Sequence, residues 1–266
     1  MQTSGSTTAA RKVALVTGAG KRIGRAIALG LAQAGWDVAV HYRASETEAL
    51  ETADGVRALG RRAALLQCDL ADEAQVRALL ARACEALGLV TCVVNNASLF
   101  EYDQPATFGH AAMERHWRAN VAPAVILAHA LHEQRAGAAD TGCVVNLLDQ
   151  KLWNPNPDYF SYTLSKAALE AATVLLAQAL APRLRVCGVA PGITLVSGPM
   201  NDDEFGKART MTPLARSSTP ADIARTVRFL IESPAITGTT LLVDGGQHLQ
   251  RQPRDVLFIA NPQREA

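Results

Sequence analysis

Short apolar runs alternate with longer amphipathic stretches along most of this chain. The apolar runs are rich in Val, Leu and Ala and have the length of buried strands: Val13–Val16, Val38–His41, Ala63–Gln67, Cys92–Asn95, Cys143–Leu148, Val186–Val189 and Leu241–Val243. The stretches between them have helical patterns: Arg22–Ala34, Glu46–Leu59, Glu73–Leu87, Ala111–Glu133, Tyr162–Leu180 and Pro220–Glu232. Because such alternation is typical of parallel sheets covered on both faces, the pattern predicts the α/β class, with a doubly wound parallel sheet of about seven strands.

The length of the chain and the spacing of these elements indicate one domain. A chain of 266 residues fits a single α/β core better than two, and we expect residues 12–249 to form it. Residues 1–11 are Ser/Thr/Gly-rich and lack the apolar core of a signal peptide, so we interpret them as a disordered leader. The irregular residues 192–219 predict a substrate loop, with a disordered insertion as the alternative. Residues 250–266 form a C-terminal tail.

Charge and composition argue against several classes of partner. The 26 basic and 25 acidic side chains leave a formal charge of +1, which offers no electrostatic basis for binding nucleic acid or an anionic membrane. The most apolar helical segment, Ala167–Ala181, has 12 apolar residues of 15, whereas a membrane span needs about 20. Five scattered cysteines without a CxxC pair indicate buried thiols in a cytoplasmic protein. His129 and His132 lack a third ligand, so no metal site is expected.

A glycine-rich turn, TGAGKRIG, follows the first strand. Gly18, Gly20 and Gly24 let the backbone approach a pyrophosphate, whose charge is stabilised by free N–H groups at the start of the next helix. Glycines also serve tight turns for steric reasons alone. The position after the first strand of an alternating fold favours dinucleotide binding, and the predicted cofactor site includes Ile23.

The end of the second strand indicates which dinucleotide is bound. An acidic residue there would bind a ribose 2′-hydroxyl, and a basic residue a 2′-phosphate. The strand ends with VAVHYRAS, without a carboxylate before Glu46. We therefore predict NADPH rather than NADH. Lys21 and Arg22 lie in the glycine turn and could face the same phosphate, with solvated surface charge as the alternative. The residues predicted at this site are His41, Tyr42, Arg43 and Ser45.

The next two strand ends extend the predicted cofactor site. Asp69, beside Leu70 in the sequence QCDL, could accept a hydrogen bond from the adenine amino group, with a helix cap as a nearly equal alternative. The fourth strand ends with NNAS, which places Asn96, Ala97 and Ser98 near the cofactor. Buried Asn pairs often tie strand ends together, so structural support of the pocket is the alternative to direct contact.

Tyr162 and Lys166 form a Tyr-x-x-x-Lys pair, one helical turn apart, so both side chains lie on one helix face. A nearby ammonium favours the phenolate, and we expect it to lower the pKa of Tyr162 and make the hydroxyl a usable proton donor. Asp149 lies just beyond the preceding strand, thirteen residues earlier (162 − 149 = 13).

With these motifs the chain resembles the short-chain dehydrogenase/reductase family from Lys12 to about Gly246. The resemblance rests on TGAGKRIG, NNAS, Asn120, YTLSK, APG and VDGG, in that order and at the family's spacing. It implies a Rossmann fold and hydride transfer from a nicotinamide without a metal. It further implies that Tyr162 is the proton donor, that Lys166 binds the nicotinamide ribose and that Asn120 holds a proton-relay water. The cofactor contacts that it adds are Pro191, Gly192 and Ile193.

Two departures from the common family pattern point to the substrate. Asp149 stands where the family usually has Ser, and Arg22 where it usually has Gly. A carboxyl group can hydrogen-bond and protonate ring nitrogens, so Asp149 favours a nitrogen heterocycle, with a helix cap or loop salt bridge as the alternative. Both residues together resemble the pteridine reductase branch, which includes dihydromonapterin and alternative dihydrofolate reductases. In that branch the Arg contacts cofactor phosphate and pterin, and the Asp works with the Tyr to supply protons.

The same branch implies that Phe100 stacks on the pterin, with ordinary core packing as the alternative. The predicted substrate-binding residues are Arg22, Ser98, Phe100, Asp149 and Tyr162. The predicted function is NADPH-dependent reduction of a dihydropterin, dihydromonapterin or dihydrofolate to the tetrahydro form. The alternatives are reduction of a ketone or 3-oxoacyl thioester and, from another class, a non-enzymatic cofactor-binding protein.

Two apolar surfaces predict self-association. The helix Tyr162–Ala181 is apolar on nearly all faces, which one sheet face cannot cover, and the family forms tetramers through this helix and the preceding one. We therefore expect a homotetramer. The apolar cluster DVLFI, Asp255–Ile259, lies in an otherwise polar tail, and we expect it to dock on a neighbouring subunit. The residues between Asp149 and Tyr162 receive no assignment.

Overall fold

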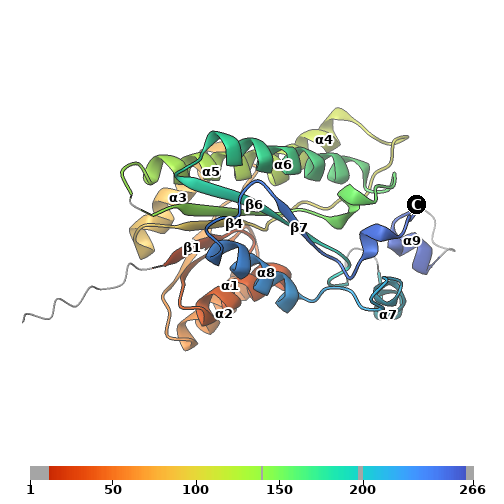
Figure 1. The fold of residues 1–266 in the computed structure, drawn as a ribbon, viewed down its shortest axis with the longest axis horizontal. Helices are drawn as coiled ribbons and strands as arrows, with labels where there is room; N and C mark the ends of the chain where they lie inside the picture. Colours follow the sequence, from red (N-terminus) through yellow and green to blue (C-terminus); the bar gives the residue numbers. More distant parts are fainter. Residues whose placement is uncertain (1–11, 139, 197–199, 262–266) are drawn as a thin grey trace, which may run out of the picture.

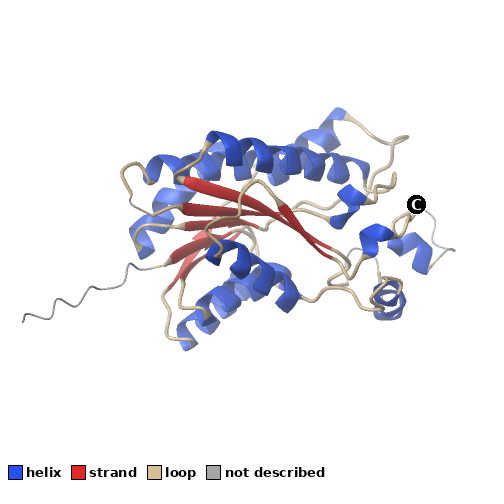
Figure 2. Cartoon of the chain, in the orientation of Figure 1, coloured by secondary structure: helices blue, strands red, loops and turns tan. Residues whose placement is uncertain are grey.

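The computed structural model describes residues 12–138, 140–196 and 200–261 of the chain. Seven parallel strands form one sheet in the order β3-β2-β1-β4-β5-β6-β7. This confirms the predicted doubly wound Rossmann-type sheet (Figures 1 and 2). The strands are β1 (Val13–Val16), β2 (Asp37–Tyr42), β3 (Ala63–Gln67), β4 (Cys92–Asn95), β5 (Gly142–Leu147), β6 (Leu184–Pro191) and β7 (Thr240–Val243).

Helices cover both faces of the sheet (Figure 1). One face carries α1 (Arg22–Gln33), α2 (Glu46–Ala58) and α8 (Pro220–Glu232), packed over a core that includes Ile27 and Val227. The other carries α3 (Glu73–Leu87), α5 (Ala122–Gln134) and α6 (Phe160–Ala179), over a core that includes Leu79 and Leu127. The strand order reverses between β1 and β4, and ligands of such folds bind beyond the carboxyl ends of the strands at that point.

The helix predicted at Ala111–Glu133 is interrupted. It consists of α4 (His110–His116), a π-helical turn at Trp117–Val121, and α5. A π-turn inserts an extra residue into the helical register, and such turns occur frequently at functional sites. Asn120 lies in this turn. Hydrophobic periodicity could not reveal it, because the apolar pattern continues across the turn.

The predicted irregular loop at residues 192–219 contains a helix, α7 (Asp202–Thr210). It begins with a capping box, in which Asn201 accepts the amide of Glu204 and the Glu204 carboxylate accepts the amide of Asn201. The prediction of a continuous loop was therefore wrong, although the capping signal was present in the sequence.

The C-terminal tail packs on its own chain. A short helix, α9 (Val256–Ala260), buries Val256, Leu257 and Phe258 in an apolar cluster with Met200 and Ala208 of the α7 region. Figure 1 shows α7 and α9 side by side beyond the sheet, at the end where β7 finishes. The expectation that this cluster docks on a neighbouring subunit was wrong, because its apolar side chains are already buried.

Among the described residues, no helix is long and apolar enough to cross a membrane.

Candidate active site

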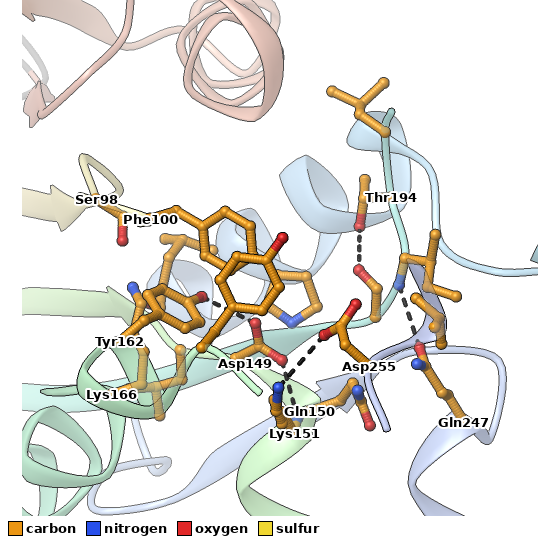
Figure 3. Close-up of a pocket in the computed structure, with 18 of the residues that line it drawn as sticks. Ser98, Phe100, Asp149, Gln150, Lys151, Tyr162, Lys166, Thr194, Gln247 and Asp255 are labelled. Carbon is orange, nitrogen blue, oxygen red and sulfur yellow. Dashed lines mark hydrogen bonds and ion pairs between the residues drawn. The ribbon is translucent and has the colours of Figure 1, made fainter. Parts of the chain in front are cut away.

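A pocket of about 280 Å³ lies beyond the carboxyl ends of the central strands. Its wall includes Ser98 and Phe100 after β4, Asp149 after β5, and Tyr162 and Lys166 of α6. Figure 3 shows these side chains converging on one cavity. The fold therefore brings together the predicted proton donors and the predicted substrate-binding residues.

Asp149 and Tyr162 are joined by a hydrogen bond. The Tyr162 hydroxyl donates to Asp149 Oδ2 at 2.8 Å, and the backbone amide of Lys151 donates to Asp149 Oδ1 at 2.9 Å. Asp149 thereby caps a short 3₁₀ turn, η2 (Gln150–Trp153), as well as contacting Tyr162. Asp149 therefore has both roles: it caps this turn and accepts the hydrogen bond of the phenol. Both carboxylate oxygens have partners, which fixes the orientation of the group beside Tyr162.

The pKa of Tyr162 is raised well above its ordinary value, first by burial and then by the neighbouring Asp149 carboxylate. The expectation that Lys166 lowers this pKa was wrong. Lys166 Nζ donates to the carbonyl of Leu147 at 2.7 Å and lies 5.7 Å from the Tyr162 ring centroid, whereas the carboxylate contacts the hydroxyl directly. Burial also lowers the pKa of Lys166 to about 8.

Burial raises the pKa of the Asp149 carboxyl as well, although the Lys151 amide and the Tyr162 hydroxyl favour its ionised form. The hydroxyl and the carboxyl therefore both hold protons more tightly than they would in water. Because they share a hydrogen bond, they titrate as a pair. Such a pair can store a proton beside a bound substrate and release it to a group that becomes strongly basic during the reaction.

Asn120 is buried and its side-chain amide has several protein partners. Nδ2 donates to the Leu99 carbonyl at 3.0 Å and to Ser165 Oγ at 2.9 Å, and Oδ1 accepts the Leu99 amide at 2.6 Å. Asn120 thus ties the segment after β4 to α6 at Ser165, the residue before Lys166. The predicted role in holding a relay water stays a prediction.

The glycine turn after β1 is closely packed. A Cβ atom at Gly24 would lie 2.1 Å from the carbonyl oxygen of Gly18, and one at Gly18 would lie 3.0 Å from Ala97 Cα. Asn96 Nδ2 donates to the carbonyls of Thr17 and Gly18 at 2.9 and 3.2 Å. The Asn96 side chain therefore supports the turn, as the structural alternative predicted.

His41 has a different role from the one predicted. Its side chain is buried, with Nδ1 accepting the Gly18 amide and Nε2 facing the Cys68 carbonyl, each at 3.0 Å. Since an amide donates to Nδ1, the proton of the neutral ring lies on Nε2. Burial lowers the pKa of His41 to about 4. The prediction that His41 contacts the 2′-phosphate was wrong: it links the glycine turn to the end of β3.

Other predicted cofactor residues lie at the surface around this turn. Arg43 is exposed after β2, and Ser45 precedes α2 without capping it through its side chain. Lys21 forms an exposed ion pair with Glu48 at 3.4 Å.

Asp69 Oδ1 accepts the Ala71 amide at 3.0 Å, whereas Asp72 caps α3, so the helix-cap alternative for Asp69 was wrong. Tyr42 ends β2, while Leu70, Pro191, Gly192 and Ile193 follow or end the neighbouring strands.

Arg22 has a strained backbone. Its φ is +55°, in the left-handed region that favours glycine, which gives a physical reason for the glycine common at this position. A non-glycine residue there costs roughly 1–2 kcal/mol. The Arg22 side chain lines the pocket, and Nη1 donates to the Val196 carbonyl of the 192–219 segment at 2.7 Å. A non-glycine residue in a strained backbone conformation is a candidate functional residue.

Phe100 is 39% exposed, which excludes ordinary core packing as its role. Its ring stacks on Tyr159 with a centroid separation of 4.1 Å. It also makes a T-shaped contact with Tyr162, with a centroid separation of 4.7 Å. Tyr159 has φ +54° and precedes α6. The stacking partner of Phe100 in this structure is therefore Tyr159.

Several site residues were not predicted from the sequence. The Asp103 carboxylate accepts hydrogen bonds from the amide and the hydroxyl of Ser161, 58 residues later in the sequence. It thereby caps the start of the helix that carries Tyr162. Lys151 is buried in the pocket wall and contacts the tail residue Asp255. No local pattern reveals either contact, because each joins residues far apart in sequence. Among the described residues, no three His, Cys, Asp or Glu side chains gather as metal ligands.

Comparisons with known proteins agree on the class of enzyme and differ on the substrate. A family model described as Enoyl-(Acyl carrier protein) reductase matches residues 18–248. The chain is 32% identical over 251 residues to L-rhamnose 1-dehydrogenase (NAD(P)(+)) of Sphingomonas sp. (strain SKA58), covering 91% of this chain and 98% of the relative. It is 31% identical over 243 residues to the 3-oxoacyl-[acyl-carrier-protein] reductase FabG of Staphylococcus aureus (strain Mu50 / ATCC 700699), covering 90% and 98%.

Among solved structures, the chain is similar to FolM alternative dihydrofolate reductase 1 from Brucella canis, complexed with NADP. The identity is 40%, the TM-score 0.85, and the alignment covers 91% of this chain and 96% of the other. The corresponding protein from Brucella suis, also in complex with NADP, has 40% identity, a TM-score of 0.87 and the same coverage.

The buried His41 predicts a specific pH dependence of stability. Between pH 6.5 and about 4 the unfolded chain binds a proton at His41 that the folded chain does not, so acidification favours unfolding. The full effect is about 3 kcal/mol. Asn at this position does not titrate and retains an acceptor for the Gly18 amide. We expect the stability difference between the wild-type protein and His41→Asn to shrink from pH 7 to pH 4.5 in denaturant titrations; a difference independent of pH would contradict the assignment.

Proposed function

The chain belongs to the short-chain dehydrogenase/reductase family, and from this premise we propose that it reduces a pterin-type substrate with NADPH. The proposed reaction converts a dihydropterin, dihydromonapterin or dihydrofolate to the tetrahydro form. The observation that carries the proposal is the hydrogen bond between the Tyr162 hydroxyl and the Asp149 carboxylate, at 2.8 Å in the pocket wall. A carbonyl oxygen and a ring nitrogen both take up a proton on reduction, but a carboxyl group beside the phenol is suited to a ring nitrogen, which it can hydrogen-bond as well as protonate.

The glycine turn fits a dinucleotide. A Cβ atom at Gly24 would collide with the Gly18 carbonyl and one at Gly18 would press against Ala97, so both glycines are needed for the tight turn into α1. Helix α1 starts without a side-chain cap and without an acidic residue in its first turn, which leaves its N-terminal amides suited to a pyrophosphate. Relatives solved in complex with NADP agree with NADPH as the cofactor. Arg43 and Ser45 would then hold its 2′-phosphate, while His41 holds the turn.

The pocket residues supply the proton of the reaction. Bound NADPH would supply a hydride to the carbon of the substrate C=N bond. The π electrons of that bond pass to nitrogen, which takes one proton from the Tyr162–Asp149 pair. One C–H and one N–H bond form, and the π bond breaks. Lys166, held by the Leu147 carbonyl, remains close enough to Tyr162 to offset the negative charge left on the pair.

Phe100 and Arg22 would hold the heterocycle. A flat ring would stack on Phe100, whose exposed ring borders Tyr162 at 4.7 Å. Binding in this position would compete with Tyr159, which stacks on Phe100 in this structure. Arg22 would contact the cofactor phosphate and the substrate together, which accounts for an arginine at a strained position.

Reduction of a ketone or a 3-oxoacyl thioester is the second candidate. It is favoured by the 31% identity to 3-oxoacyl-[acyl-carrier-protein] reductase FabG. Asp149 weighs against it, because nothing in carbonyl reduction requires a carboxyl group beside Tyr162.

Replacing Arg43 tests the cofactor site. Arg43→Asp removes the proposed partner of the 2′-phosphate and adds a repelling charge, so the preference for NADPH over NADH should fall by roughly tenfold to a hundredfold. Dissociation constants of both cofactors, from quenching of protein fluorescence, measure the effect. Arg61→Asp is the control, since Arg61 is exposed at the opposite end of the sheet before β3. An unchanged NADPH preference in Arg43→Asp would place the phosphate elsewhere.

Replacing Asp149 tests the substrate class. Asp149→Ser should lower turnover of dihydropterins by about 10² and leave NADPH affinity nearly unchanged. Tyr162→Phe should also slow turnover, and the double variant should lose less than the product of the two single losses, because the two groups act as one proton donor. Asp54→Ser on the exposed surface of α2 is the control. Full dihydropterin turnover by Asp149→Ser, measured by NADPH absorbance, would remove the main support for this function.

We also propose a homotetramer formed through α5 and α6. Leu175 of α6 is 63% exposed and Leu164 is 39% exposed, on the face where α4, α5 and α6 lie together (Figure 1). Light scattering should give four chains of 28.2 kDa for the wild-type protein and smaller species for Leu175→Arg. Leu50→Arg is the control, because Leu50 is 45% exposed on the opposite face, in α2. A monomeric wild-type protein would refute this proposal.

A further inference from the structure

The C-terminal tail forms one wall of the pocket that holds Asp149 and Tyr162. Gln252, Asp255 and Leu257 line this pocket, although they follow the last strand of the sheet. Figure 3 shows Asp255 within the same cavity as Asp149. The tail therefore contributes side chains to the substrate side of the site.

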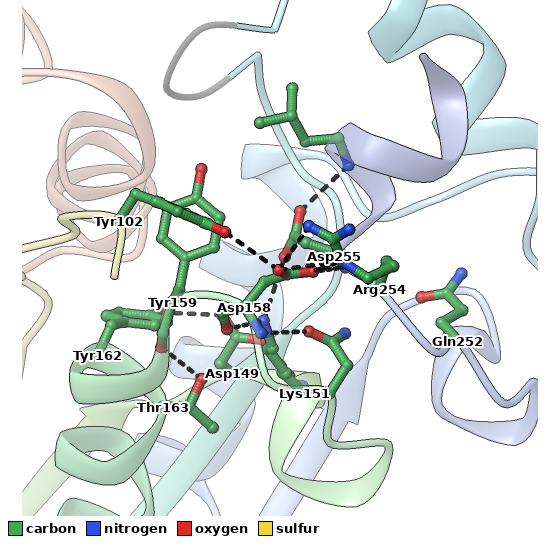
Figure 4. A network of polar contacts seen from close by, with 12 residues as sticks. Tyr102, Asp149, Lys151, Asp158, Tyr159, Tyr162, Thr163, Gln252, Arg254 and Asp255 are labelled. Atoms are coloured by element: carbon green, nitrogen blue, oxygen red, sulfur yellow. Dashed lines mark hydrogen bonds and ion pairs between the residues drawn. The ribbon is translucent and has the colours of Figure 1, made fainter. Parts of the chain in front are cut away.

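A buried carboxylate holds the tail in place. Asp158 is 2% exposed; its Oδ2 accepts Arg254 Nε at 2.8 Å and its Oδ1 accepts Arg254 Nη2 at 2.9 Å. The Asp255 amide also donates to Asp158 Oδ2 at 2.7 Å (Figure 4). Burial alone would raise the pKa of Asp158, but the hydrogen bonds from Arg254 and the Asp255 amide outweigh it and hold the pKa below its ordinary value. The backbone of Asp255 is thus fixed by charge-assisted contacts.

The Asp255 carboxylate retains capacity to accept hydrogen bonds. Oδ1 accepts the Leu257 amide at 3.1 Å, and Oδ2 lies 3.3 Å from Lys151 Nζ. A carboxylate offers about four acceptor positions, so these two contacts do not exhaust it. The side chain is 20% exposed in the pocket wall. Its charge also reaches the proposed proton donor, because it is among the causes that raise the pKa of Tyr162, after burial and Asp149.

The surroundings of Asp255 suit a ligand with hydrogen-bond donors. The Lys151 ammonium is 6% exposed and is committed to the Asp158 carbonyl at 2.6 Å, to Asp255 and to the face of Tyr159. Neutral side chains supply further polar groups of the pocket wall, among them the amides of Asn156, Gln247 and Gln252 and the hydroxyl of Thr194. This part of the pocket therefore favours neutral or cationic donors over anionic groups.

We propose that Asp255 is a second substrate-binding carboxylate, which accepts hydrogen bonds from the amino-bearing, amidine-like edge of the bound heterocycle. This edge differs from the ring nitrogen that Tyr162 and Asp149 protonate. The inference rests on the proposed function and extends it, because it assigns the recognition of the heterocycle to the tail. Asp255 acts as a specificity-determining residue, and Lys151 and Asp158 act as the positioning residues that hold it.

Two ligands that differ only in donors test this assignment. The probes are 2-amino-4-oxopteridine and its 2-methyl analogue, which lacks the amino group, each titrated into the enzyme saturated with NADP⁺. The wild-type protein should bind the amino compound about tenfold more tightly or better, as expected for hydrogen bonds to a charged acceptor. Asp255→Asn should lose most of this discrimination. Asn caps a helix as well as Asp does, so the tail and α9 should remain in place.

Further variants separate recognition from a merely structural role of the tail. Asp255→Glu keeps the carboxylate and should retain part of the discrimination, and Asp203→Asn on the exposed surface of α7 should retain all of it. A structural role of Asp255 would weaken both probes equally in Asp255→Asn, and that result would overturn the proposal, as would undiminished discrimination. Turnover of dihydropterins by the wild-type protein is measured in parallel: its absence would refute the proposed function, whereas turnover with unchanged discrimination in Asp255→Asn would refute only the role of Asp255.

Discussion

The hydrogen bond between Asp149 and Tyr162 is the interaction on which the proposed chemistry of this site depends. Burial raises the pKa of the Asp149 carboxyl and of the Tyr162 hydroxyl, and the carboxylate raises the pKa of the hydroxyl further. Such a pair is stable only if the surrounding structure holds it, because desolvation disfavours the ionised carboxylate. The Lys151 amide, bonded to Asp149 at 2.9 Å, and the Lys166 ammonium supply that support. The outcome is a proton held next to the space where a substrate would bind.

The rest of the fold positions this pair from several directions. Strand β5 ends at Leu147, which places Asp149 at the edge of the sheet and lets the Leu147 carbonyl accept Lys166. Asp103 caps the start of α6 and so fixes the turn that carries Tyr162. Asn120 connects the same helix to the end of β4 through its π-turn. These contacts join four separate segments, and displacement of any one would move Asp149 or Tyr162 relative to the glycine turn.

Hydrophobic patterns predicted the alternating strands and helices, but they could not predict side-chain contacts between segments remote in sequence. The seven strands and the long helices between them follow from the hydrophobic pattern, since most of the strands are largely apolar and the helices are either amphipathic or apolar over a longer stretch. The Tyr162–Lys166 spacing and the unusual Asp149 are likewise local features, so a sequence reveals them. By contrast, the effect of Asp149 on the Tyr162 pKa, the support that His41 gives to the glycine turn, and the contact of Lys151 with Asp255 depend on distances between segments remote in sequence. His41 was predicted to contact a phosphate because it lies at the end of a strand. Its sequence position does not show that the ring points into the protein.

If the Tyr162–Asp149 pair protonates a ring nitrogen rather than a carbonyl oxygen, the substrate preference of the enzyme should show it. The most direct measurement is kcat/KM of the wild-type protein for NADPH oxidation with a dihydropterin, with dihydrofolate, with a simple ketone and with a 3-oxoacyl thioester, under one set of conditions. A dihydropterin or dihydrofolate should be reduced with a kcat/KM at least about 10² above that of either carbonyl substrate, the contribution expected of one positioned general acid. Equal or faster reduction of the ketone or the thioester would contradict the proposed role of the pair.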